Sequence, residues 1–147
     1  MRLVLVHHAE AAAHEEDSRR PLSSRGEAQA EYGAAAAAAR GAKPAVVWHS
    51  GKLRARQTAL AFWRACNALA EFSATPDLQP GDSPSRMRGR LRGETRDVLI
   101  AGHFPHLPGL LSLLLNTPAS FPQHGAVALE TADAGETWQE LWRVESD

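Results

Sequence analysis

Histidines and an arginine stand where several apolar runs of the sequence end, and their side chains suit phosphoryl chemistry. Polar residues directly follow three short apolar runs: His7-His8, His49-Ser50 and Gly102-His103. Arg54 follows the second of these and lies in the first turn of an expected helix. Helix N-termini favour anions, and a guanidinium offers a planar set of donors that matches phosphate oxygens. The residue types therefore point to a phosphate site with imidazoles beside it.

The elements that must position these residues alternate between strand and helix. We expect buried strands at 3–6, 45–48 and 97–101, helices at 24–40, 53–69 and 107–115, and a hairpin made of 126–131 and 138–144. The proline-rich stretch 73–84 is expected to be largely loop. This alternation predicts a three-layer α/β/α sandwich with a mostly parallel sheet and helices on both faces. In such sheets, sites form beyond the carboxyl ends of the strands, where His8 and His103 stand.

Length and composition set the broad class. The chain has 147 residues, of which 44% are apolar, so one domain spanning 1–147 with a real core is expected. Its net charge of −1 provides no global field for nucleic acid or a membrane surface, and we expect neither as a partner. No signal peptide or membrane-length apolar run is present, which predicts a cytoplasmic protein. Nothing in the sequence demands more than a monomer.

Four segments carry a resemblance to a known family. They are residues 5–10, 20–26, 50–58 and 98–105. In their order and spacing they resemble the histidine phosphatase superfamily, and most of all its short SixA-type phosphohistidine phosphatases. The resemblance implies the phosphoglycerate mutase-like version of the α/β/α sandwich. It also implies a phosphatase that needs no cofactor and acts on a phosphohistidine protein or a small phosphomonoester.

The resemblance assigns roles to three residues. His8 matches the histidine that attacks phosphorus and becomes a phosphohistidine, Arg54 matches the arginine that holds the phosphate oxygens, and His103 matches the second histidine that donates to them. A neutral imidazole is needed for the attack, and an ordinary histidine with a pKa of about 6.5 is partly neutral at physiological pH. Covalent catalysis then divides one displacement into two easier ones.

Residue 7 departs from the family pattern. The family has an arginine immediately before the nucleophile, whereas this chain has His7. A charged hydrogen bond is worth roughly 1.5–3 kcal/mol, so its loss from the transition state slows the reaction about tenfold to a hundredfold. Protonation of His7 by bound phosphate, or Arg20 moving in from the next loop, are two ways to recover part of this. The alternative is an attenuated or inactive relative that binds phosphate and serves a regulatory role.

The proton donor for the leaving group is not fixed by the sequence. Asp82, Asp17 and Glu10 are all candidates, and their spacing does not choose among them. Four imidazoles could instead form a metal cluster: His7, His8, His103 and His106. No carboxylate or thiolate accompanies them at ligand spacing, and Arg54 would repel a cation. We therefore expect no metal.

Several other conspicuous residues are expected to be structural. We expect His49 to pack in the core and His106 to begin a helix. Five arginines occur within 86–96, but no aromatic residues interleave with them, so a solvated helix face is favoured over a nucleic-acid patch. Trp138 and Trp142 lie four residues apart in an expected strand, which predicts that both face the same side of the sheet.

Overall fold

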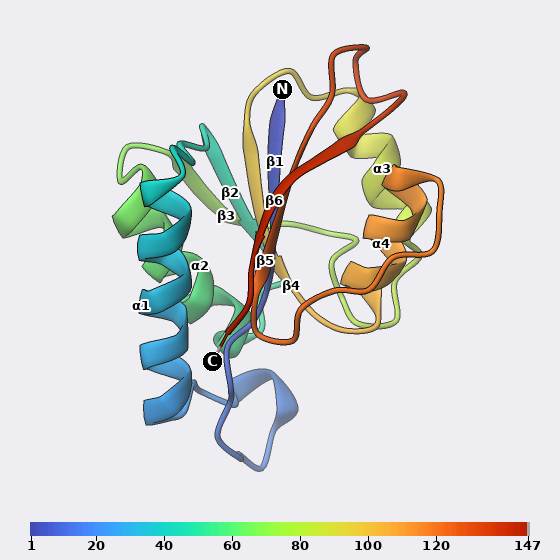
Figure 1. The fold of residues 1–147 in the computed structure, drawn as a ribbon. Coiled ribbons are helices and arrows are strands. Elements are labelled where there is room, and N and C mark those ends of the chain that lie inside the picture. Colours follow the sequence, from blue (N-terminus) through green and yellow to red (C-terminus); the bar gives the residue numbers. More distant parts are fainter. Residues whose placement is uncertain (147) are drawn as a thin grey trace.

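A six-stranded sheet forms the centre of the protein in the computed structural model, which describes residues 1–146 (Figure 1). The strands lie in the order β3-β2-β4-β1-β5-β6. Their bounds are β1 (Arg2–His7), β2 (Val46–His49), β3 (Glu71–Ala74), β4 (Val98–Gly102), β5 (Ala126–Glu130) and β6 (Gln139–Val144). The first four strands pair in parallel, and β5 and β6 join antiparallel at the β1 edge. This is the mostly parallel sheet that the sequence predicts.

Helices cover both faces of the sheet, which confirms the three-layer sandwich. In Figure 1, α1 (Ser24–Ala39) and α2 (Leu53–Cys66) lie on one side, while α3 (Pro84–Arg92) and α4 (His106–Leu115) lie on the other. A short 3-10 turn at Asp17–Arg19 interrupts the loop after β1. α2 ends three residues before the predicted Leu69, because the backbone at its C-cap turns extended. None of the helices within residues 1–146 is long and apolar enough to cross a bilayer.

The central strand β1 is buried on both faces, as its apolar run predicts. Leu3 and Leu5 pack with the large side chains of α3 and α4, whereas Val4 and Val6 pack towards α1 and α2. Alternate residues of a strand face opposite sides, so one run of four apolar residues serves two cores. This packing fixes the strand end that carries His8.

A glycine lets the loop after β1 lie directly on the start of α1. Ser23 caps this helix by accepting the Gly26 N–H, and its own N–H donates to the Glu10 carbonyl. A Cβ at Gly26 would lie 1.9 Å from that carbonyl oxygen, so only glycine allows this close approach. The contact holds the chain two residues beyond His8.

Two expectations about strands were wrong. β3 was not predicted, because Phe72 is the only large apolar residue among its four and the strand is largely exposed at the sheet edge. Trp138 and Trp142 do not share a face: Trp138 packs with the α3 and α4 side and Trp142 with the α1 and α2 side. A register shift between Ala128 and Leu129 breaks the alternation along the hairpin.

Candidate active site

A cavity of about 280 Å³ opens at the carboxyl ends of β1 and β4, and it brings the three principal candidates together. Its lining residues are His7, His8, Arg20, Arg54, Pro80, His103, Phe104, Gln123 and His124. β1 and β4 are neighbours with His7 opposite Gly102, so His8 and His103 emerge side by side. Their ring centroids are 5.2 Å apart. Arg54 enters from the first turn of α2.

The hydrogen bonds of His8 leave one ring nitrogen available for chemistry. Its Nδ1 lies 2.7 Å from the Ala9 carbonyl oxygen, which can only accept, so Nδ1 carries the hydrogen and Nε2 keeps its lone pair. Burial, with a smaller effect from the Arg54 charge, lowers the pKa of His8 to about 4. The next N–H, of Ala9, donates to the Thr58 hydroxyl, which itself donates to the Arg54 carbonyl. His8 is thus a neutral imidazole tied to the helix that carries Arg54.

The Ser50 hydroxyl contacts one ring nitrogen of His103 and bears on where the ring hydrogen lies. The Ser50 hydroxyl accepts the Lys52 N–H and lies 2.6 Å from His103 Nε2, so its own hydrogen can be donated to that nitrogen. In that tautomer the imidazole hydrogen lies on Nδ1, a buried atom with no partner among residues 1–146. Burial lowers the pKa of His103 to about 3, so the ring is neutral. The sequence marks Ser50 only as the polar end of a strand.

Arg54 is buried, and its guanidinium is held from one side. Nη1 donates to the Asp17 backbone carbonyl at 2.9 Å, and Nη2 donates to the Asp17 carboxylate at 3.3 Å. Its Nε is buried and has no partner among the described residues. Unsatisfied buried donors are rare because each is costly. Arg54 Nε and His103 Nδ1 are two such donors beside one cavity, which favours an oxyanion as the missing acceptor.

His7 occupies the position of the family arginine as a fixed neutral ring. It is stacked between Phe104, at 4.0 Å, and His124, at 4.9 Å between ring centroids. Its Nδ1 accepts the backbone N–H of His124 at 2.8 Å, which leaves the hydrogen on Nε2. Burial, and then the neighbouring His8, lower the pKa of His7 to about 2. These contacts argue against the expectation that bound phosphate protonates His7.

Arg20 reaches the cavity, as the sequence analysis allows. Its Nε donates to the Ala12 carbonyl at 3.3 Å, and its Nη1 lies 3.4 Å from the Asp17 carboxylate. The guanidinium therefore stands beside Arg54 with Asp17 between them. A phosphate in the cavity would meet two arginines from different elements.

The three carboxylates proposed as proton donors lie outside this cavity. Glu10 accepts the Ser23 hydroxyl at 2.9 Å, and Asp82 accepts the Gln79 N–H at 2.9 Å. Asp17 meets Lys52 at 2.5 Å, and that hydrogen bond, together with the Arg54 charge, holds the pKa of Asp17 well below its usual range. A carboxylate that stays ionised has no proton to give. Its ionised state argues against Asp17 as the general acid, while Glu10 and Asp82 remain candidates that do not line the cavity.

His124 is the cavity residue that the sequence analysis missed. It lies 116 residues from His8, and its Nδ1 is 2.7 Å from the His8 carbonyl oxygen. The topology contains a signal: β5 runs antiparallel to β1, so the residues just before β5 meet the carboxyl end of β1. That signal depends on knowing that the C-terminal hairpin pairs with β1.

Three imidazoles at the cavity are close enough to form a metal site, although they differ from the four that the sequence suggests. His7, His8 and His124 each offer a nitrogen within 4.8 Å of the others, while His106 begins α4. The accepting nitrogen of His7 is already bonded to a backbone N–H, so only two rings keep a free lone pair. Two imidazoles beside Arg54 make a poor cation site, and we assign no metal to them.

The remaining conspicuous residues have structural roles. His49 accepts the Gly51 N–H and packs 4.9 Å from the Phe72 ring, which confirms it as a core residue. On α3, Arg86 and Arg90 form ion pairs with Asp77. The arginine-rich segment is thus an ion-paired helix face.

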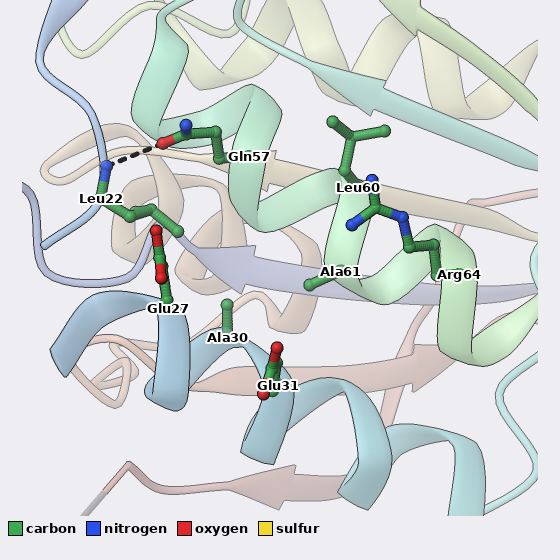
Figure 2. A pocket seen from close by; sticks show the side chains of 8 residues that line it. All are labelled: Leu22, Glu27, Ala30, Glu31, Gln57, Leu60, Ala61 and Arg64. Atoms are coloured by element: carbon green, nitrogen blue, oxygen red, sulfur yellow. Dashed lines mark hydrogen bonds between the residues drawn. The ribbon is translucent and has the colours of Figure 1, made fainter. Parts of the chain in front are cut away.

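A second hollow of about 350 Å³ lies between α1 and α2 (Figure 2). Glu27, Glu31 and Arg64 are the charged residues in its lining, so two carboxylates oppose one guanidinium. Figure 2 shows these side chains together with Gln57, whose amide oxygen accepts the Leu22 N–H. This charge balance does not suit a phosphate, so the cavity at β1 and β4 remains the candidate site.

Comparisons with known proteins agree with this geometry. A sequence model described as the histidine phosphatase superfamily (branch 1) matches residues 3–82, a range that contains His8 and Arg54. The protein histidine phosphatase SixA complexed with tungstate is 23% identical, with a TM-score of 0.88 over 99% of this chain and 97% of that chain. A putative phosphohistidine phosphatase SixA from Agrobacterium tumefaciens is 25% identical, with a TM-score of 0.85 over 99% and 98%. A putative alpha-ribazole-5'-P phosphatase from Escherichia coli K-12 is 17% identical, with a TM-score of 0.75 over 100% and 96%. No curated protein sequence matches this chain.

Proposed function

Because this chain belongs to the histidine phosphatase superfamily, we propose that it hydrolyses phosphohistidine in proteins, or small phosphomonoesters, through a phosphorylated His8. One observation carries the proposal. The free Nε2 lone pair of His8 shares a cavity with two buried donors that lack acceptors, on Arg54 and His103. The site therefore combines a nucleophile with an unfilled oxyanion position.

The reaction follows from these groups in two displacements. His8 Nε2 attacks phosphorus, the bond to the leaving oxygen or nitrogen breaks, and its electron pair goes to the leaving group. A water then attacks the phosphorus, and the P–N bond returns its electrons to His8 as phosphate is released. Arg54 and His103 donate to the equatorial oxygens, where negative charge concentrates during each transfer. The Ala9 carbonyl, which accepts from Nδ1, stabilises the positive charge that the ring gains as the P–N bond forms.

The substrate class rests on the relatives and on the leaving group. Two of the solved structures are described as a protein histidine phosphatase and a putative phosphohistidine phosphatase, and a third as a putative alpha-ribazole-5'-P phosphatase. A phosphohistidine leaves as an imidazole, which accepts a proton readily near neutral pH. Both displacements use only a side chain and water, so no cofactor is required.

A second candidate function is supported by residue 7. His7 is neutral and offers one donor where the family arginine offers a charged fork. Such a site can still bind phosphate through Arg54 and Arg20 but stabilises the transition state less. The alternative is therefore a phosphate-binding regulatory relative with little or no turnover.

Replacing the nucleophile tests the proposal. We expect wild-type protein to hydrolyse p-nitrophenyl phosphate and a phosphohistidine peptide, and to form an acid-labile phosphoprotein when quenched. His8→Ala should reduce both activities to background and abolish the labelled intermediate. His14→Ala is the matched control, because His14 is exposed and outside the cavity. Equal rates for wild type and His8→Ala would overturn the proposal, and phosphate binding without turnover would favour the regulatory alternative.

A further inference from the structure

The leaving group needs a proton, and the structure narrows its source. We propose that His124 is the general acid of this site and gives its Nε2 proton to the leaving group. This inference rests on the proposed function. It starts from the observation that the carboxylates expected from the sequence do not line the cavity, whereas His124 does.

The other polar groups of the cavity are unsuited to the task. The two arginines of the lining carry guanidinium groups, which bind anions rather than transfer protons. His7 and His103 are buried neutral rings with one N–H each, and the N–H of His103 is the donor already assigned to the phosphate oxygens. His8 is the nucleophile. His124 is the remaining titratable side chain in the lining described for residues 1–146.

The geometry fixes which nitrogen of His124 meets the substrate. Its backbone has φ 56°, a left-handed conformation uncommon outside glycine, just before β5 begins. Its backbone N–H donates to His7 Nδ1, and its ring Nδ1 donates to the His8 carbonyl at 2.7 Å. Nε2 is left without a partner among the described residues. The carbonyl on Nδ1 orients the ring and leaves Nε2 as the nitrogen that can meet a leaving group.

The departure at residue 7 supports the same assignment. The His124 ring is parallel to that of His7, with centroids 4.9 Å apart and 6° between the planes. An arginine at position 7 would place a permanent positive charge against the His124 ring. The neutral His7 ring adds no charge there and offers a face on which the His124 ring stacks. The substitution that weakens oxyanion binding therefore leaves room for an imidazole proton donor beside the nucleophile.

Protons and electrons balance over the cycle. As His8 attacks phosphorus, the leaving oxygen receives the electron pair of the broken P–O bond and the proton from His124 Nε2. His124, now neutral, accepts a proton from the water that attacks phospho-His8. The electrons of the P–N bond return to His8, and both histidines regain their starting states.

A leaving-group series on His124→Asn tests the assignment. Asparagine tolerates the left-handed backbone, and its amide nitrogen can take the place of Nδ1 towards the His8 carbonyl, but it has no proton to give. General acids contribute roughly 100- to 10,000-fold. We therefore expect kcat/KM to fall about 100-fold or more for an alkyl phosphate and less than about 5-fold for p-nitrophenyl phosphate. Exposed His14→Asn should leave both unchanged.

The controls separate this inference from the proposed function. Inorganic phosphate should inhibit His124→Asn and wild type to a similar extent, and the melting temperature should show that both are folded. A loss of equal size for every leaving group, or a matching loss of phosphate affinity, would overturn the assignment and make His124 a binding residue only. No loss for any substrate would also overturn it. With any of these results, the proposed function would still stand as long as the phosphatase activity depends on His8. Wild-type protein without any phosphatase activity would refute the proposed function itself.

Discussion

Replacing His7 with arginine tests whether a missing charge limits this site. His7 offers one neutral N–H, and a guanidinium would offer two charged donors. A neutral hydrogen bond contributes roughly 0.5–1.5 kcal/mol and a charged one roughly 1.5–3 kcal/mol, so the exchange adds about 1–2 kcal/mol to transition-state stabilisation. We expect His7→Arg to raise kcat/KM for p-nitrophenyl phosphate about 5- to 30-fold.

The surroundings of His7 set the cost of this change. Its Nδ1 is the acceptor for the partly buried His124 N–H, and losing that hydrogen bond costs about 1 kcal/mol of folding free energy. Stacking on Phe104, now 4.0 Å from the His7 ring, can be kept because guanidinium planes stack on aromatic rings. We therefore expect a lower melting temperature together with faster turnover.

The assay is steady-state hydrolysis at 25 °C, with folding checked by circular dichroism and phosphate inhibition measured in parallel. His7→Lys is the control, since it restores the charge without the planar fork, and it should give a smaller gain. Native-like His7→Arg protein with tighter phosphate binding but unchanged or slower turnover would refute the reasoning, because the charge would then be present without accelerating the reaction.

Three further predictions concern stability and anion binding. Burial lowers the pKa values of His8, His103 and His7 to about 4, 3 and 2, so below pH 6.5 the unfolded chain binds protons that the fold excludes. Stability is complete above about pH 7 and falls as pH drops towards 4, by up to about 1.4 kcal/mol per unit for each of the three imidazoles, which thermal melts from pH 7 to 5 would detect. Gly26→Ala should lower stability by about 1–3 kcal/mol because its Cβ meets the Glu10 carbonyl, whereas Gly89→Ala, with open space around it in α3, should be neutral or stabilising in denaturant titrations. Asp17→Asn removes the negative charge that pairs with Lys52 and two arginines. Inorganic phosphate should then inhibit about twofold to fivefold more tightly at low salt, and this gain should shrink as the salt concentration is raised.

The sequence was sufficient to predict most of the frame of the fold. The apolar runs that became β1, β2 and β4 are buried on both faces, and such runs can be recognised without tertiary information. The edge strand β3 could not be predicted, because its burial is slight and its pairing with β2 supplies what its side chains do not. The prediction that Trp138 and Trp142 share a face was wrong, because a bulge in β6 shifts the alternation of side chains. The sequence gives no sign of this bulge.

The candidate site also contains residues that the sequence could predict and residues that it could not. His8, Arg54 and His103 lie in local motifs at strand ends and at a helix start, so their convergence follows from the parallel order of β1, β4 and β2. His124 reaches the cavity only through the antiparallel return of the C-terminal hairpin. Which carboxylate could act as the general acid depends on where the loops lie. Asp17 forms ion pairs with Lys52 and two arginines, and residue spacing alone does not reveal these contacts.

The charge pattern of the cavity bears on which phosphate bond it can break. Arg54 and Arg20 already share the Asp17 carboxylate, and the imidazoles of His7 and His103 are neutral donors. Neutral donors cost less to desolvate than charged ones but stabilise a developing oxyanion less. An alkyl ester, whose leaving group is poor, depends most on that stabilisation and on a proton. A phosphohistidine depends on it least, because its leaving imidazole is a stable neutral molecule once protonated. The replacement of arginine by His7 is therefore expected to slow hydrolysis of an alkyl ester more than hydrolysis of a phosphoramidate.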